Sequence, residues 1–174
     1  MSIGIGIIGL GWISQKIYLP YFLNNEAVNK IVIYDIDLNK TKNTPIPSSV
    51  LIVNTLEALL SLSDIDAVFI ATPNFLHCEH IIKALQADKI VFCDKPICIN
   101  KEQVKSLEDI NCLYPDRLFP LLPNRFRQDI QYIKSVLEND DIGNVYKIKA
   151  HWIRDSGIPG SSWFLDSKKA GGGY

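Results

Sequence analysis

The sequence predicts an α/β fold built on a doubly wound parallel sheet. Short, continuously apolar runs alternate along the chain with stretches whose apolar residues recur at helical spacing. Continuous apolar runs are typical of strands that are buried on both faces of a parallel sheet. Hydrophobic residues make up 47% of the 174-residue chain and charged residues 21%, a balance that favours a globular protein over a disordered one.

The predicted strands are short runs rich in β-branched residues. They are expected at Ile3–Ile8, Lys30–Tyr34, Val50–Val53, Ala67–Ala71, Ile90–Cys93 and Leu118–Leu122. The helices between them are expected at Ile13–Leu23, Leu56–Leu62, Phe75–Ala87 and Lys101–Asn111. Pro20 should shorten or kink the first of these helices, and Pro45 and Pro47 argue against a full helix over residues 39–49.

Two of these helices carry a capping pattern at their start. Asn54 stands three residues before Glu57, and Asn100 stands three residues before Gln103. A small polar residue in this arrangement can accept hydrogen bonds from the N–H groups of the first helical turn. We therefore expect Asn54 and Asn100 to act as the caps.

The last third of the chain predicts the entry into a second domain. A helix at Gln128–Asn139 is followed by a turn at Asp141–Asn144 and a longer strand at Val145–Arg154. We assign residues 1–122 to a nucleotide-binding domain and 123–174 to the start of a C-terminal α/β domain. The sequence is expected to stop before that second domain is complete, and its unfinished sheet would then need a partner, such as a second copy in a homo-oligomer.

Composition and charge exclude several classes of partner. The net charge of −1 and the lack of a basic, aromatic-interleaved stripe give no reason to expect a nucleic acid or an anionic membrane. The first apolar run, Ile3–Ile13, is too short to span a bilayer and lacks the features of a signal peptide. The four cysteines show no CxxC spacing, so we expect reduced thiols and a cytoplasmic location.

The glycines near the N-terminus fit a dinucleotide-binding loop in two registers. The early register, Gly4 and Gly6, leaves too short a strand before the loop. The late register keeps Ile3–Ile8 as the strand, with Gly9 for the tight turn and Gly11 for close approach of the backbone to a pyrophosphate. Ser14 then stands where a third glycine is usual and weakens the match. Glycines in a strand can also serve close packing alone.

An acidic residue at the end of the second strand supports the late register. Asp35 lies 24 residues past Gly11, close to the usual ~20. A carboxylate there can accept a hydrogen bond from a ribose 2′-hydroxyl and repels a 2′-phosphate. The sequence therefore favours NAD over NADP.

Two polar tripeptides follow neighbouring strands and are expected at the ligand-binding edge of the sheet. Thr72-Pro73-Asn74 follows the fourth strand, and Asp94-Lys95-Pro96 follows the fifth. At that edge Lys95 could polarise a substrate hydroxyl or shuttle a proton, or it could be a solvated surface lysine.

With these motifs the chain resembles the glucose–fructose oxidoreductase and inositol dehydrogenase (Gfo/Idh/MocA) family. The resemblance rests on Gly9-Leu-Gly11, Asp35, ATPNFLH (71–77), DKP (94–96), NRF (124–126), DIGNV (141–145) and WFLDSKKAGGG (163–173). It implies an NAD(P)-binding Rossmann domain joined to an α/β domain with an open sheet. It also implies hydride transfer to or from a sugar, a polyol or a related small molecule.

The resemblance also implies roles for individual residues. Lys95 would be catalytic and would contact both substrate and nicotinamide, beside Asp94 in place of the family's usual glutamate. Trp12 follows the glycine loop and could cover the cofactor or staple its helix to a neighbour. The full set of expected cofactor-binding residues is Gly9, Gly11, Trp12, Ile13, Asp35, Thr72, Pro73, Asn74, His77, Asp94, Lys95 and Arg125. No metal is expected, because His77 and His80 lack further ligands.

One departure from the family keeps an alternative open. The family's glycine run leads into an Asp-x-Gly-x-His motif that handles the substrate and the proton, whereas this sequence ends at Tyr174, one residue beyond the run. If the natural chain ends there, we expect a non-catalytic dinucleotide-binding or interaction module.

Overall fold

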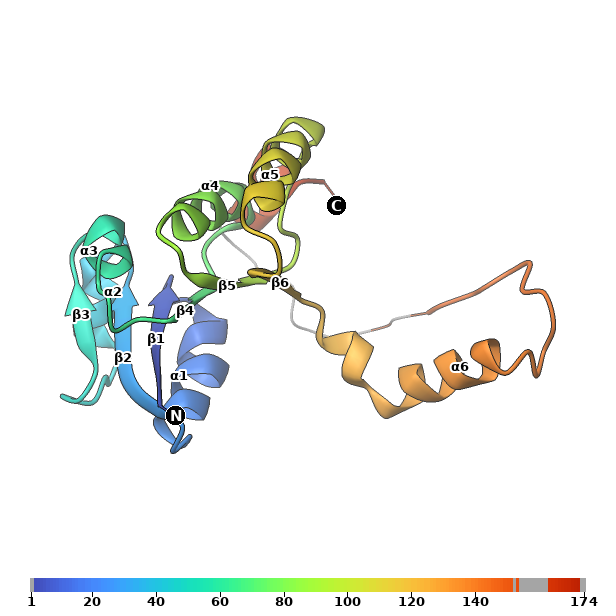
Figure 1. Ribbon diagram of the computed structural model, residues 1–174, viewed down its shortest axis with the longest axis horizontal. Coiled ribbons are helices and arrows are strands. Elements are labelled where there is room, and N and C mark those ends of the chain that lie inside the picture. The colour runs from blue at the N-terminus through green and yellow to red at the C-terminus, as the bar shows by residue number, and fades with distance from the viewer. Residues whose placement is uncertain (1, 152, 154–162, 173–174) are drawn as a thin grey trace. The chain divides into compact units, whose positions relative to one another are not determined.

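The computed structural model describes residues 2–151, 153 and 163–172. Its centre is a six-stranded, all-parallel sheet with the strand order β3-β2-β1-β4-β5-β6 (Figure 1). The strands are β1 (Ile3–Ile8), β2 (Val28–Tyr34), β3 (Leu51–Val53), β4 (Ala67–Ile70), β5 (Ile90–Asp94) and β6 (Leu118–Leu121). This order is that of the doubly wound dinucleotide-binding fold, so the predicted fold class is confirmed.

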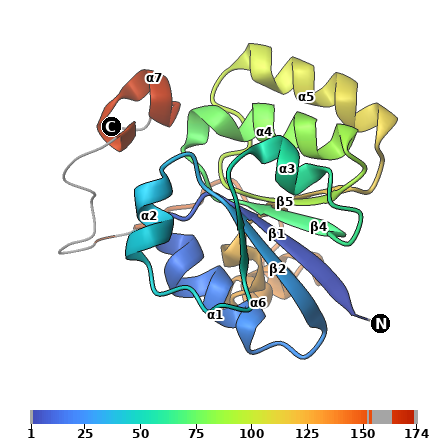
Figure 2. The ribbon, with the colours of Figure 1, turned by 90° about the vertical axis from the view of Figure 1, so that its left-hand side faces the viewer.

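Helices cover both faces of the sheet. Figure 2 shows α3, α4 and α5 on one side and α1 on the other. The helices are α1 (Leu19–Leu23), α2 (Leu38–Asn43), α3 (Leu56–Leu60), α4 (Asn74–Gln86), α5 (Lys101–Leu113), α6 (Gln128–Glu138) and α7 (Ser167–Ala170). Short 3₁₀ turns, η2 (Pro123–Phe126) and η3 (Trp163–Leu165), precede α6 and α7.

The apolar strands supply two cores because successive side chains of a strand point to opposite faces. On one face Ile8, Val68 and Ile70 pack with buried side chains of α3, α4 and α5. On the other face Ile7 and Ile33 pack with Leu19 and Phe22 of α1. The continuous apolar runs in the sequence are therefore explained by burial on both sides.

Two glycines of β1 lie against close neighbours. A Cβ atom on Gly4 would lie 1.8 Å from the carbonyl oxygen of Asp64. A Cβ atom on Gly6 would lie 2.7 Å from Cδ2 of Leu59 and 3.0 Å from Cγ1 of Val68. Gly4 and Gly6 thus serve packing in the central strand, as the late register of the glycine loop predicts.

The first helix is interrupted close to its start. Residues Ser14–Tyr18 form a π-helical turn, η1, in which the N–H of Leu19 donates to the carbonyl oxygen of Ser14. Pro20 lies in the first turn of the α1 segment that follows. Because proline has no N–H, it cannot donate to the preceding turn. The sequence predicts that Pro20 shortens or kinks this helix, and in the structure the helix is interrupted by the π-helical turn just before Pro20.

Two further expectations about helices meet different outcomes. Asn100 caps α5 as predicted, its side chain accepting from the N–H of Gln103 at 2.9 Å. The predicted cap of α3 is wrong by one residue, because Thr55, and not Asn54, accepts from the N–H of Ala58 at 3.1 Å. Before Pro45 a short helix, α2, does form, but it ends at Asn43.

The predicted strand at Val145–Arg154 is wrong for its described residues. Residues 145–151 and 153 have no regular secondary structure, and Trp152 and Arg154 lie outside the described residues. A strand needs a neighbouring backbone to complete its hydrogen bonds. None of the described segments pairs with this one.

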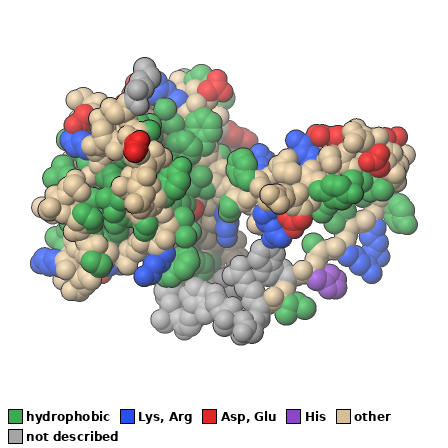
Figure 3. Space-filling view, turned by 90° about the horizontal axis from the view of Figure 1, so that it is seen from below, with side chains coloured by type: hydrophobic (Ala, Val, Ile, Leu, Met, Phe, Trp, Pro, Cys, Tyr) green, Lys and Arg blue, Asp and Glu red, His purple; other side chains and the backbone are tan. Residues whose placement is uncertain are grey.

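The chain divides into two compact units, Met1–Leu121 with Trp163–Tyr174, and Leu122–Ser162. The second unit contains η2 and α6. In α6, Ile130, Ile133 and Leu137 recur at helical spacing and are exposed. Figure 3 shows apolar side chains gathered along the right-hand part of the view, where α6 lies. The predicted boundary between two domains at residue 122 stays a prediction.

No helix formed by the described residues has both the length and the apolar character needed to cross a bilayer.

We expect Gly4→Ala to destabilise the fold by about 3 kcal/mol or more, because its methyl group would overlap backbone atoms that have little freedom to move. Gly11→Ala is the matched control, since the nearest atom to its Cβ would be 3.8 Å away, an ordinary contact. Urea unfolding followed by circular dichroism measures both. Equal stability of the two variants would contradict the packing role of Gly4.

Candidate functional site

The loop after β1 turns sharply at Gly9. Its φ angle is +96°, in the left-handed region that favours glycine, and its N–H donates to the carbonyl oxygen of Tyr34 at 2.8 Å. A Cβ atom at this position would lie 2.8 Å from the carbonyl oxygen of Ala71. Only glycine therefore lets the chain leave β1 so close to the end of β4.

Beyond Gly9 the loop runs into the start of a helix. Trp12 and Ile13 form the first helical turn, where N–H groups have no intrahelical acceptor. Such N–H groups, with the positive end of the helix dipole, attract anions. Trp12 is 70% exposed and Ile13 half-buried. The loop thus meets the geometric needs of a pyrophosphate site, and the exposure of Trp12 argues against its alternative role as a staple.

Ser14 has a specific contact where the usual pattern has glycine. Its side chain is fully buried, and its hydroxyl donates to the carbonyl oxygen of Gly9 at 2.5 Å. Gln15 makes a similar contact, its Nε2 donating to the carbonyl oxygen of Leu10 at 3.0 Å. The serine that weakens the sequence match therefore helps to hold the helix against the loop.

Asp35 follows β2 and lies beside the glycine loop, as predicted. Its carboxylate is only 4% exposed and accepts hydrogen bonds from the N–H of Leu10 at 2.7 Å and the N–H of Asp37 at 2.8 Å. Nζ of Lys40 lies 3.3 Å from each carboxylate oxygen. The carboxylate fastens the loop to the end of β2. Its predicted contact with a ribose stays a prediction.

His77 joins the loops that follow β4 and β5. Its imidazole is 1% exposed, with Nδ1 2.7 Å from the carbonyl oxygen of Pro96 and Nε2 2.7 Å from the carbonyl oxygen of Thr72. The two tripeptides that the sequence singled out are therefore held together by one side chain. The imidazole lies buried behind these loops, and its predicted role in lining a cofactor stays a prediction.

The other residues after β4 also have partners. The Thr72 hydroxyl lies 3.0 Å from Nδ1 of His80, and Nδ2 of Asn74 donates to the carbonyl oxygen of Ala170 in α7 at 2.9 Å. Pro73 directly precedes α4 and is half-buried. These contacts order the loop after β4 from both sides.

Tyr18 is a residue of this edge that sequence reasoning missed. Its hydroxyl donates to Oδ1 of Asp94 at 2.5 Å, reaching across from the π-helical turn to the end of β5. Burial raises the pKa of Asp94, while the Tyr18 hydrogen bond and the charge of Lys95 oppose this shift. A buried tyrosine hydroxyl usually has a hydrogen-bond partner, and this rule is the sequence signal that points to a polar contact for Tyr18.

A row of aromatic rings packs against Tyr18. The centroid of its ring lies 5.5 Å from that of Phe69. The Phe69 ring stacks on Phe92 with 4.6 Å between centroids, and Phe92 stacks on Phe119 with 5.2 Å between centroids. These rings come from β4, β5 and β6 and share one face of the sheet. The row fixes the phenol against the strands, so that its hydroxyl meets Asp94.

Lys95 stands at the end of β5 with its side chain exposed. The structure therefore brings Lys95 to the same sheet edge as the glycine loop, as predicted. Arg125 lies in η2, in the second unit, and is exposed. Its predicted role in cofactor binding stays a prediction.

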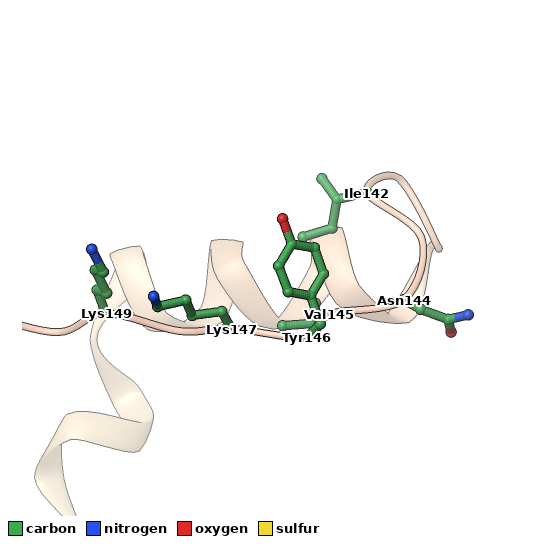
Figure 4. A pocket seen from close by; sticks show the side chains of 6 residues that line it. All are labelled: Ile142, Asn144, Val145, Tyr146, Lys147 and Lys149. Atoms are coloured by element: carbon green, nitrogen blue, oxygen red, sulfur yellow. The ribbon is translucent and has the colours of Figure 1, made fainter.

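The second unit holds an open hollow of about 410 Å³. Figure 4 shows its lining residues, Ile142, Asn144, Val145, Tyr146, Lys147 and Lys149. Its lining offers two lysines, the Asn144 amide and the Tyr146 phenol beside apolar contacts, and it contains no carboxylate, histidine or thiol. Nowhere in the described part of the chain do three His, Cys, Asp or Glu side chains gather as metal ligands would.

Comparison with known families matches residues 3–111 to a model described as an oxidoreductase family with an NAD-binding Rossmann fold. D-glucoside 3-dehydrogenase of Escherichia coli (strain K12) is 26% identical over 170 residues, which cover 97% of this chain and 48% of that protein. The chain spans about half the length of the curated relatives it matches.

Solved structures share the fold. Scyllo-inositol dehydrogenase from Lactobacillus casei, with bound NAD(H) and scyllo-inositol, matches with a TM-score of 0.74 and 24% identity over 83% of this chain and 43% of that one. A 3-ketoreductase from Actinomadura kijaniata, in complex with TDP-benzene and NADP, matches with a TM-score of 0.70 and 24% identity over 82% and 45%. One neighbour holds NAD(H) and the other NADP, so the fold does not decide between them.

The buried His80 predicts a pH-dependent stability. Burial lowers its pKa from 6.5 to about 4, so the unfolded chain binds a proton between these values while the folded chain does not. Stability is therefore lost as the pH falls from 6.5 towards 4, by roughly 3 kcal/mol from this group.

His80→Asn should remove this part of the slope, whereas His151→Asn, at an exposed site, should keep it. Urea unfolding at a series of pH values between 7.5 and 4 measures the free energy of unfolding. A slope that is the same in both variants would refute the assignment to His80.

Proposed function

The chain belongs to the Gfo/Idh/MocA oxidoreductase family, and from this membership we propose that it is the nucleotide-binding part of a dehydrogenase that acts on a sugar or polyol. One observation carries the proposal. The Gly9 turn, Asp35 and Lys95 all lie at the carboxyl edge of the sheet, where the strand order reverses between β1 and β4. Open α/β sheets bind their ligands at this switch point.

The residues at this edge fit a nicotinamide dinucleotide. Gly9 is in a conformation only glycine adopts easily, and the space beside Gly11 is open, its nearest neighbouring atom lying 3.8 Å from an added Cβ. The N–H groups of Trp12 and Ile13 would hold the pyrophosphate. Asp35 would lie by the adenosine ribose, and Thr72, Pro73 and Asn74 would line the nicotinamide side.

Lys95 is proposed as the catalytic residue. When bound, the nicotinamide ring supplies the site that accepts or releases hydride. The exposed ammonium of Lys95 would donate a hydrogen bond to the substrate oxygen and hold its developing charge. Asp94, fixed by the Tyr18 hydroxyl, and His77, which joins the two loops, keep the end of β5 in place.

The substrate class is proposed from the relatives together with the chemistry of the edge. D-glucoside 3-dehydrogenase acts, by its name, on a secondary alcohol of a sugar ring, and scyllo-inositol is a cyclic polyol. Both present a ring carbinol whose oxygen a single ammonium group could polarise. We therefore propose oxidation of a ring hydroxyl, or reduction of the corresponding ketone.

The binding half of this proposal is tested by titrating the chain with NADH. We expect saturable binding, and Gly11→Ala should weaken it by about tenfold or more because the methyl group would occupy the path of the pyrophosphate. Isothermal titration calorimetry measures the affinity, with circular dichroism to show that the variant keeps its fold. Absence of NADH and NADPH binding at millimolar concentration would overturn the proposed function.

The catalytic half is tested by turnover. We expect NADH formation at 340 nm with NAD and a panel of inositols and glucosides. Lys95→Met should reduce it by about 100-fold or more, since a positioned acid–base group contributes that much. Binding without turnover on the whole panel would favour the alternative, a non-catalytic dinucleotide-binding module.

A further inference from the structure

The carboxylate of Asp35 is not a free acceptor. Its two oxygens accept hydrogen bonds from the N–H groups of Leu10 and Asp37, at 2.7 and 2.8 Å, and only 4% of the residue is exposed. The simple rule that an acidic residue here meets the ribose and repels a 2′-phosphate assumes a carboxylate facing the ligand. In this chain the carboxylate instead faces its own loop.

Lys40 is the charged group that covers Asp35 on the solvent side. It lies in α2, and its Nζ is 3.3 Å from both carboxylate oxygens. The Lys40 side chain is 46% exposed against 4% for Asp35. An ammonium group has three N–H donors, so a second acceptor can share Lys40 with Asp35.

The neighbouring acidic residue is also occupied. Oδ1 of Asp37 accepts from the N–H of Asn39 at 3.0 Å and so caps α2. Its carboxylate is therefore held at the start of the helix. Lys42, two residues past Lys40, is exposed on the same short helix but makes no ion pair with Asp35 among the described residues.

We propose that Lys40 is the residue that lets this chain bind NADP(H) as well as NAD(H). Its ammonium, and not the Asp35 carboxylate, is the group presented to the 2′ position of the ribose. It neutralises the buried carboxylate and offers a donor to a 2′-phosphate, so that the site accepts both cofactors. The proposal rests on the proposed function, since it assigns a cofactor to the same edge.

The chemistry of the pair explains why one lysine suffices. The repulsion between a carboxylate and a phosphate is offset when a cation lies between them. A hydrogen bond from an ammonium to a phosphate joins two opposite charges, whereas one to a 2′-hydroxyl joins a charged donor to a neutral acceptor and is weaker. Removing Lys40 should therefore cost NADPH much more than NADH.

The test measures the dissociation constants of NADH and NADPH by their fluorescence on titration, at one fixed ionic strength. In Lys40→Ala we expect the ratio of the NADPH constant to the NADH constant to rise about tenfold or more. Lys42→Ala removes the same charge from the same helix, and its ratio should stay within about twofold of the wild type.

A second variant separates this role from a structural one. Lys40→Arg keeps the cation and should keep the wild-type ratio, whereas a general loosening of α2 would weaken both cofactors in every Lys40 variant. An unchanged ratio in Lys40→Ala, or an equal loss of both cofactors, would overturn the role of Lys40. Wild-type chain that binds neither cofactor would instead overturn the proposed function.

Discussion

At Gly4 in the central strand, β1, and at Gly9 just after it, the backbone lies closer to its neighbours than a side chain would allow. The carbonyl oxygen of Asp64 occupies the space that a Cβ of Gly4 would need, and that of Ala71 lies against the position of a Cβ on Gly9. Because these two positions have no side chain, the residues just before and just after β4 pack directly against the two ends of β1. As a result, three segments meet at one edge of the sheet: the glycine loop, the start of its helix and the loop after β4. The contacts of the candidate site depend on this meeting.

At that edge most polar side chains hold the protein to itself. Asp35 ties the glycine loop to β2, His77 joins the loops after β4 and β5, and Tyr18 holds Asp94. The backbone of this edge is thus fixed by buried or half-buried side chains. The groups proposed to meet a ligand, Trp12, Lys40 and Lys95, are exposed. Under that proposal, rigidity and recognition are divided between different residues.

Most of the first unit could be predicted from the sequence, because its information is local. Continuous apolar runs predict all six strands of the sheet, and the family resemblance carried by the loop motifs is confirmed by the match over residues 3–111. The strand predicted at Val145–Arg154 is wrong for its described residues, because an apolar pattern does not show whether a pairing partner exists. Contacts such as Tyr18 to Asp94 span 76 residues and leave no periodic trace. The ion pair of Lys40 with Asp35 depends on the short helix α2, in a segment where Pro45 and Pro47 argue against a full helix.

The π-helical turn lets the first helix keep two alignments, one with the glycine loop before it and one with the core after it. Each residue advances an α-helix by about 100°, so one additional residue would turn everything after it away from the sheet. The wider turn at Ser14–Tyr18 absorbs that residue. The segment before it stays aligned with the glycine loop, and Leu19 and Phe22 stay aligned with the core. Tyr18 lies at the joint between the two alignments, so the turn that keeps Leu19 and Phe22 on the core also carries the phenol that reaches Asp94.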